Sequence, residues 1–236
     1  MISGQKLSRT FVIGQNETHA LSNVDFSAKD GEFVAIIGKS GAGKSTLMYQ
    51  LSLLDTPTHG SVTINGINTS TLSPNERTKF RLAYLGYVFQ DYALVPELTA
   101  EENVLLPLLM RGEQYGYALK KSRATLESLG LGHRLDRRPG RLSGGEQQRV
   151  SIARAITHEP LILFADEPTA NLDTESSKQL LSHLEDMHKR GQTIIMVTHE
   201  LDYAARAQRV LELSDGKVTR EGTPQELNLL SGAVVR

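Results

Sequence analysis

One stretch rich in glycine has residue types and a spacing that suit phosphate chemistry. Residues 38–45 read Gly-Lys-Ser-Gly-Ala-Gly-Lys-Ser and match G-x-x-x-x-G-K-[ST] at every fixed position. Glycines let successive backbone N–H groups face an anion, and a helix beginning at Lys44 adds its positive N-terminal end. The alternative, a plain glycine turn, is disfavoured by the full match. We expect a nucleoside triphosphate here, with Lys44 on its β- and γ-phosphates and the Ser45 hydroxyl on Mg²⁺. The expected nucleotide contacts are Gly38, Lys39, Ser40, Gly41, Ala42, Gly43, Lys44, Ser45 and Thr46.

Two acidic residues follow an apolar stretch further along the chain. Residues 161–165 read Leu-Ile-Leu-Phe-Ala and lead directly into Asp166 and Glu167. A buried strand ending there would present Asp166 to Mg²⁺, and Glu167, on the other side of the strand, would be the general base for an attacking water. A helix N-cap is the alternative for such a pair. His199 follows the apolar run 193–198 and is either a hydrogen-bond donor to the γ-phosphate or an ordinary loop residue.

A second helix start has the features of an anion site. Residues 142–149 read Leu-Ser-Gly-Gly-Glu-Gln-Gln-Arg, in which Ser143 and Glu146 form an S-x-x-E capping box. Gly144 and Gly145 leave the backbone amides accessible to an anion. Two such helix starts could not easily reach one nucleotide from within one compact domain. The sequence therefore predicts a head-to-tail pair of chains, in which each copy completes the other's site.

The elements that hold these residues alternate between strands and helices. Residues 33–37 form a continuous apolar run typical of a strand in a parallel sheet. Short strands are expected in the first thirty residues, and others over 61–65, 85–89, 161–165, 193–198 and 209–213. Helices are expected over 44–54, 101–111, 117–129, 144–158 and 174–190. The pattern predicts one domain over 1–236, with an α/β core of 1–90 and 159–236 interrupted by a helical subdomain at 91–158.

Composition narrows the function further. The chain has 236 residues, 26 Lys and Arg against 27 Asp and Glu, and no cysteine. The balanced charge shows no excess of basic residues that would favour binding to nucleic acid. The lack of cysteine excludes a disulfide scaffold and a zinc ribbon. No apolar run approaches the about 18 residues of a membrane span, and residues 1–16 do not read as a signal peptide. We expect a cytosolic protein, or one attached to a membrane through another protein.

Two further groups of side chains are interpreted as solvated. His183 and His188 lie five residues apart on one expected helix and do not share a face that could hold a metal. A basic cluster near the second helix start is taken as a solvated face rather than as a phosphate-steering patch. It comprises Arg134, Arg137, Arg138, Arg141, Arg149 and Arg154.

Taken in order, these motifs resemble those of the ATP-binding-cassette (ABC) ATPases over essentially the whole chain. The resemblance adds two features to the expected site residues, the segment Asn171-Leu-Asp173 and Gln90. It implies a P-loop NTPase core with a mainly parallel sheet, a small N-terminal antiparallel β subdomain and an inserted α-helical subdomain. It also implies that Gln90 ligates Mg²⁺ or water and reports to a permease, and that Asp173 lies across a dimer interface.

Three positions depart from the usual residues of the family that the chain resembles. Phe11 stands where the family usually carries tyrosine and would stack on adenine. Glu146 replaces the commoner glutamine, which satisfies a capping box equally well. Ala170 stands where glycine is frequent, and nothing in the sequence explains that change.

Finer likenesses suggest a branch of the family. Residues 54–58, 89–96, 102–104 with Pro107, and 166–173 look like the macrolide-exporter and lipoprotein-releasing branch. The resemblance implies an ATP-hydrolysing subunit that dimerises around two ATP-Mg²⁺ and drives a separate membrane permease, peripheral on the cytoplasmic face of the cell membrane. Residues 92–98 would form a groove for the permease, or else core under the helical insertion.

Two other functions stay open on the sequence. One is a soluble ABC-type ATPase acting on DNA or the ribosome, which is disfavoured because the chain has no cysteine, no heptad run and one cassette. The other is a nucleotide-gated scaffold without turnover, which Glu167 and His199 argue against.

Overall fold

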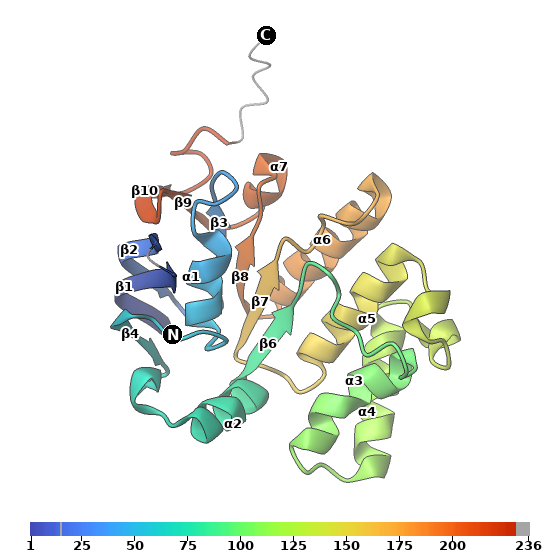
Figure 1. Ribbon diagram of the computed structural model, residues 1–236. Coiled ribbons are helices and arrows are strands. Elements are labelled where there is room, and N and C mark those ends of the chain that lie inside the picture. Colours follow the sequence, from blue (N-terminus) through green and yellow to red (C-terminus); the bar gives the residue numbers. More distant parts are fainter. Residues whose placement is uncertain (15, 230–236) are drawn as a thin grey trace. The chain divides into compact units, whose positions relative to one another are not determined.

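The structure, a computed structural model, describes residues 1–14 and 16–229 (Figure 1). These residues fall into two compact units. The first unit contains the described residues of 1–77 and 188–236, and the second contains Thr78–Met187. The unit boundaries fall inside two helices, α2 (Pro74–Tyr84) and α6 (Thr174–Lys189). Each unit is described by itself.

The first unit opens with an antiparallel sheet. Its strands are β1 (Ile2–Ile13), β2 (Asn16–Ala28), β4 (His59–Ile64) and β5 (Ile67–Asn68), in the order β2-β1-β4-β5. Along β2 the buried positions alternate, at Val24, Phe26 and Ala28, so that one face of the strand packs and the other is exposed. This sheet is the small N-terminal β subdomain that the sequence resemblance implied.

The remaining strands of the first unit belong to a mainly parallel sheet. β3 (Phe33–Ile37) lies between β8 (Thr193–Val197) and β9 (Arg209–Ser214), parallel to both, and β10 (Lys217–Gly222) pairs antiparallel with β9. Every residue of β3 and β8 is buried, as expected for strands covered on both faces. Helix α1 (Lys44–Leu51) follows β3, a 3₁₀ turn η1 (Thr69–Thr71) follows β5, and α7 (Leu201–Ala204) follows β8.

The second unit combines two strands with helices. β6 (Leu85–Val88) pairs in parallel with β7 (Ile162–Asp166). The connection between them contains α3 (Ala100–Met110), α4 (Tyr115–Ser128), the 3₁₀ turns η2 (Gly132–Arg134) and η3 (Pro139–Arg141), and α5 (Gly144–Ile156). Leu105, Leu108 and Ala118 form a small core between α3 and α4. The predicted helical subdomain at 91–158 lies wholly in this unit, and its boundaries stay a prediction.

The expected α/β architecture is confirmed, and four of the helices and strands in the structure go beyond those expected. β5, α2, α7 and β10 were not expected from the sequence. The helix expected over 44–54 ends earlier, at Leu51, because Leu53 has a positive φ of 61° that a helix cannot accommodate. No helix in the described ranges is long and apolar enough to cross a membrane.

Candidate functional site

The loop between β3 and α1 needs its glycines for two separate reasons. Gly38, Gly41 and Gly43 have φ values of 149°, 79° and 99°, which residues with a Cβ adopt only under strain. A Cβ on Gly38 would also lie 2.3 Å from the carbonyl oxygen of Leu213, and one on Gly43 would lie 2.4 Å from that of Ala20. The loop is therefore fitted against β9 on one side and β2 on the other.

The start of α1 is arranged to hold an anion. Its N-cap is Gly43, and among the described residues no side chain caps the helix. The first N–H groups of a helix carry partial positive charge, which attracts phosphate when no side chain satisfies them. The Lys44 side chain is buried, and its ammonium donates to the carbonyl oxygens of Gly38, at 2.9 Å, and Lys39, at 3.1 Å. The cation is thus held inside the loop that the sequence assigns to phosphate.

Replacing Gly43 by alanine tests this fit. We expect the Gly43→Ala variant to lose about 2–4 kcal/mol of unfolding free energy, because the positive φ and the contact with Ala20 are both violated. Gly41→Ala is the matched control, since Gly41 also has a positive φ but a Cβ there meets nothing within 4 Å. Urea unfolding should place Gly41→Ala clearly above Gly43→Ala in stability. Equal losses would show that the close approach to β2 does not constrain the loop.

His199 leaves the parallel sheet at the same edge as the glycine loop. β3 and β8 run parallel with Ile36 opposite Val197, and the Thr198 N–H donates to the Ile36 carbonyl at 3.1 Å. The carboxyl ends of parallel strands meet at one edge, where ligands bind in open α/β sheets. The His199 side chain is 57 % exposed there, with its Nε2 3.3 Å from a Glu200 carboxylate oxygen. The structure therefore brings His199 and residues 38–45 to one edge.

Phe11 lies near the exposed end of β1. Its side chain is 40 % exposed, and the Arg9 guanidinium carbon lies 4.7 Å from the centre of the ring. A cation at this distance is attracted by the π-face and holds the ring in place. The exposed ring fits the predicted stacking on a base, which stays a prediction.

In the second unit, the acidic pair follows β7 as expected. Asp166 is the last residue of the strand and is buried, and the Tyr87 hydroxyl of β6 donates to its carboxylate at 3.1 Å. Glu167 lies one residue beyond the strand with φ 44°, so the alternation of the strand does not set the direction of its side chain, and its predicted orientation stays a prediction. A left-handed conformation costs a non-glycine residue about 1–2 kcal/mol. Such strain concentrates where a side chain must be held in one place for function.

The loop after β6 is tied to the segment after β7. Gln90 is exposed, and its carbonyl accepts a hydrogen bond from the Asn171 side chain at 3.1 Å. The Tyr92 hydroxyl donates to the Asn171 carbonyl at 3.2 Å. Because β6 and β7 are parallel, Gln90 and Asp166 also leave the same edge. The sequence reasoning missed this connection, since it considered Asn171 only as part of a motif.

The predicted capping box at the start of α5 is present. Glu146 N–H donates to the Ser143 hydroxyl at 3.2 Å, and Ser143 N–H donates to the Glu146 carboxylate at 2.8 Å. Arg134 Nε also donates to Glu146 at 2.7 Å. The backbone hydrogen bond from Ser143 and the Arg134 charge hold the pKa of Glu146 below its usual value. A glutamate at this position is therefore compatible with an intact helix start.

The two glycines after Ser143 lie close to neighbouring side chains. A Cβ on Gly145 would lie 2.7 Å from the Ser176 hydroxyl of α6, and one on Gly144 would lie 3.0 Å from the Tyr92 hydroxyl. Asp173 accepts from the Ser176 N–H and hydroxyl, each at 2.8 Å, and these bonds lower its pKa. Asp173 thus caps α6 locally, and its predicted place in a dimer interface stays a prediction.

Some side chains interpreted as solvated are not. Arg154 donates to the carbonyls of Ala93, at 2.6 Å, and Tyr92, at 3.0 Å, and burial lowers its pKa. It therefore holds the loop after β6, where Tyr92 and Ala93 have positive φ. His183 is half-buried, and burial lowers its pKa. The His188 ring packs edge-on against Phe33, with the ring centres 5.8 Å apart, so the solvated interpretation is wrong for it.

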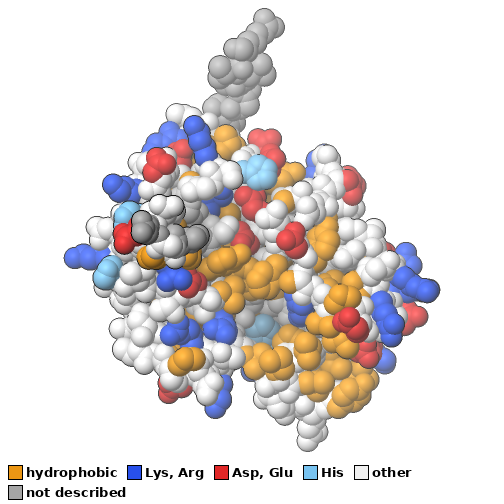
Figure 2. Space-filling view, viewed as in Figure 1, with side chains coloured by type: hydrophobic (Ala, Val, Ile, Leu, Met, Phe, Trp, Pro, Cys, Tyr) orange, Lys and Arg blue, Asp and Glu red, His pale blue; other side chains and the backbone are white. Residues whose placement is uncertain are grey.

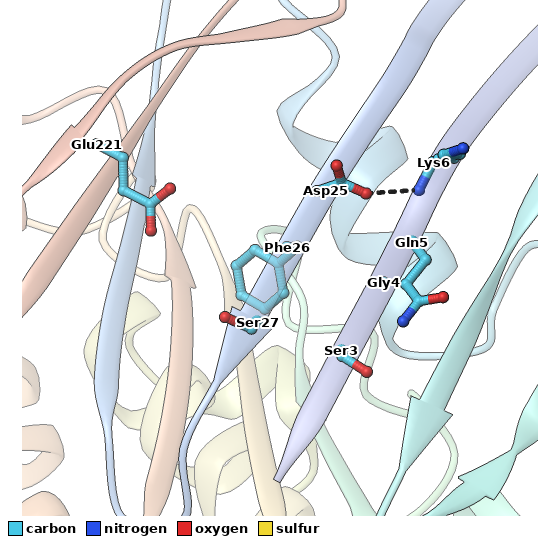
Figure 3. Close-up of a pocket in the computed structure, with 8 residues that line it drawn as sticks. All are labelled: Ser3, Gly4, Gln5, Lys6, Asp25, Phe26, Ser27 and Glu221. Atoms are coloured by element: carbon cyan, nitrogen blue, oxygen red, sulfur yellow. Dashed lines mark hydrogen bonds between the residues drawn. The ribbon is translucent and has the colours of Figure 1, made fainter.

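A wide cavity of about 610 Å³ lies elsewhere in the first unit, against β1 and β2 (Figure 3). Its lining residues are Ser3, Gly4, Gln5, Lys6, Asp25, Phe26, Ser27 and Glu221. The Lys6 backbone N–H donates to the Asp25 carboxylate at 2.8 Å, as the dashed line in Figure 3 marks. None of the predicted site residues lines this cavity.

Comparison with known proteins decides the family. Residues 21–170 match the family described as ABC transporter. The chain belongs to this family. It is an ABC ATPase that binds ATP, and the expected family and fold are confirmed. The motif at residues 38–45 and the acidic pair at 166–167 both lie within the matched part.

Curated ABC relatives cover most of the chain. A protein of Methanocaldococcus jannaschii, named as the uncharacterized ABC transporter ATP-binding protein MJ1508, is 45 % identical over 92 % of this chain and 97 % of its own length. The lipoprotein-releasing system ATP-binding protein LolD of Aquifex aeolicus is 48 % identical over 86 % of this chain and 91 % of its own. The macrolide export ATP-binding/permease protein MacB of Chlorobaculum tepidum is 44 % identical over 97 % of this chain, which spans 35 % of MacB.

A solved ABC structure resembles the whole described fold. It is the ATP-binding cassette MJ0796, a dimer in a post-hydrolysis state bound to ADP and Pi. It superposes with a TM-score of 0.90 and 38 % identity, over 95 % of this chain and 99 % of that one. This likeness covers more of the chain than the 21–170 match.

Proposed function

We propose that two copies of this chain close head-to-tail on two ATP-Mg²⁺ and that hydrolysis reopens them. The proposal rests on two glycine-rich helix starts, at Gly43 before α1 and at Ser143 before α5, which the sequence assigns to phosphate. Support comes from MJ0796, which forms a dimer bound to ADP and Pi. In this arrangement each nucleotide contacts the loop at 38–45 of one copy and Ser143, Gly144 and Gly145 of the other.

The predicted ligand residues suit Mg²⁺. Ser45, Gln90 and Asp166 offer a hydroxyl, an amide and a carboxylate oxygen, and Mg²⁺ prefers such hard oxygen ligands. When bound, Mg²⁺ would neutralise phosphate charge. Among the described residues no group of three or more His, Asp or Glu gathers as a metal site. We therefore assign the ion to the nucleotide, held by these oxygens, rather than to a metal cage made by the protein alone.

The remaining site residues receive the following roles in the proposal. Lys44 neutralises the phosphates, Glu167 orients the attacking water and accepts its proton, and His199 holds a γ-phosphate oxygen. Phe11 stacks on the adenine, with Arg9 behind the ring. Asp173 lies where the two copies meet.

We further propose that the chain drives a membrane permease, for export or lipoprotein release, from the cytoplasmic face of the cell membrane. The names of LolD and MacB support this branch, and MacB joins an ATP-binding part to a permease in one protein. Each residue of 92–98 is partly or fully exposed, which favours a docking surface over buried core. Exposed apolar side chains also gather at the α3–α4 turn, at Met110, Tyr115 and Tyr117 (Figure 2).

Co-purification from the native host tests the permease proposal. We expect the tagged chain, extracted in mild detergent, to bring down one integral membrane protein, and we expect that protein to stimulate its ATPase activity. A second function, an ATPase acting on DNA or the ribosome, predicts stimulation by those partners instead. Recovery of no membrane protein, together with stimulation by DNA or ribosomes, would overturn the permease proposal.

A further inference from the structure

A buried glutamine in α1 faces a small cavity. The Gln50 side chain is fully buried, yet within the described part of the chain neither its amide oxygen nor its amide nitrogen has a hydrogen-bond partner. Gln50 lines a cavity formed with residues after α1, with β4 and η1, and with Arg77 of α2. The Nε of Arg77 is also buried and unpaired among the described residues. Three unpaired polar atoms thus belong to two residues around one cavity.

The other polar side chains of this cavity already have partners. Thr69 donates to the Val62 carbonyl at 2.8 Å, and the Ser70 hydroxyl accepts from the Val62 N–H at 3.2 Å. Asp55 pairs with Arg9 at 2.8 Å, and Arg77 Nη1 donates to the Thr56 hydroxyl. None of these groups forms a hydrogen bond with the Gln50 amide in the structure. The described residues therefore leave both polar atoms of this amide unsatisfied.

The size of the cavity matches one small molecule. It leaves about 10 Å³ for the centre of a water molecule, which is close to the smallest space that holds one. A water can accept from the Gln50 amide nitrogen or from Arg77 Nε and can donate to the Gln50 amide oxygen. Leaving a buried amide unsatisfied costs about 1–3 kcal/mol for each polar atom, whereas holding an ordered water costs at most about 2 kcal/mol and satisfies several atoms at once.

We propose that this cavity is a binding site for one internal water, which joins Gln50 of α1 to Arg77 of α2. A monovalent cation would need the same space, but the Arg77 guanidinium repels positive charge and the Asp55 carboxylate that also lines the cavity already pairs with Arg9. Because α1 begins at the glycine loop, the bound water anchors the far end of that helix against η1 and α2. The site is independent of the nucleotide and is occupied whether or not ATP is bound.

Replacing Gln50 by leucine distinguishes a cavity that holds a water from an empty one, because the two predict changes in Tm of opposite sign. If a water is bound, the Gln50→Leu variant removes the amide that binds it, so the water and Arg77 Nε lose a hydrogen-bond partner. We then expect Tm to fall by about 3–6 °C. With a dry cavity, leucine would remove an unsatisfied amide at similar volume, and Tm would rise. The control is Gln179→Leu, at an exposed position of α6, where we expect a change within about 2 °C.

A second measurement does not depend on the variant. A crystal structure of the wild-type chain at high resolution should show a discrete water peak within hydrogen-bond distance of both the Gln50 amide and Arg77 Nε. A Gln50→Leu Tm that rises, or that stays within the range of the control, contradicts the proposal. So does well-ordered density for both side chains with no peak between them.

Discussion

The Glu167→Gln variant should bind ATP normally and hydrolyse it about 10²–10⁴-fold more slowly than the wild type. Glutamine keeps the size and the hydrogen-bonding reach of glutamate but cannot take a proton from water. It also tolerates the left-handed φ of 44° no worse than glutamate, so the fold around it should not change. With hydrolysis blocked, the closed pair should persist, and size-exclusion chromatography with ATP-Mg²⁺ should show a dimer.

Glu175→Gln provides the control for this prediction. Glu175 is an exposed glutamate in the first turn of α6, and its loss should leave the hydrolysis rate near that of the wild type. If Glu167→Gln hydrolyses ATP at the wild-type rate, Glu167 is not the general base. If both the variant and the wild type stay monomeric at saturating ATP, the proposed pair of chains is wrong.

The second large effect is expected at Ser143. Aspartate is as good an N-cap as serine, so Ser143→Asp should keep the start of α5 and change Tm by about 2 °C or less. It places a negative charge where the proposal puts the γ-phosphate of the partner's nucleotide. We expect the hydrolysis rate to fall by about 10²-fold or more and the ATP-dependent dimer to disappear.

The neutral variant Ser143→Asn separates charge from shape. Asparagine also caps a helix well but adds no charge, so its hydrolysis rate should fall by about tenfold or less. Normal hydrolysis by Ser143→Asp would show that α5 does not approach a triphosphate in either copy. Equal losses in the two variants would show that shape, and not charge, matters at this helix start.

The sequence was most informative where one residue type has one structural use. Positive φ and close contacts with β9 and β2 explain why residues 38–43 are rich in glycine, so that motif could be recognised directly. The buried runs of β3 and β8 and the capping box of Ser143 were predicted for similar reasons. In each case the requirement leaves a mark in the local sequence pattern, even where, as at Gly38 and Gly43, a distant strand imposes it.

Elements without an apolar pattern were missed. Only Phe80 is buried in α2, so the helix shows no hydrophobic period, although Ser73 and Glu76 form a capping box that could have marked its start. Arg154 looked like one more solvated cation, because its partners Tyr92 and Ala93 lie some sixty residues away. The unpaired amide of Gln50 could be seen only once the packing around it was known.

Mixing two inactive variants tests most directly whether each site is shared between two chains. In a pair made of one Glu167→Gln chain and one Ser143→Asp chain, one site holds both defects and the other holds none. The two proteins are combined before ATP is added, so that mixed pairs can form. The mixture should then hydrolyse ATP well above either component, at about a quarter of the wild-type rate if pairing is random. Were each chain to complete its own site, every site would carry one defect, and the mixture would stay as inactive as its components.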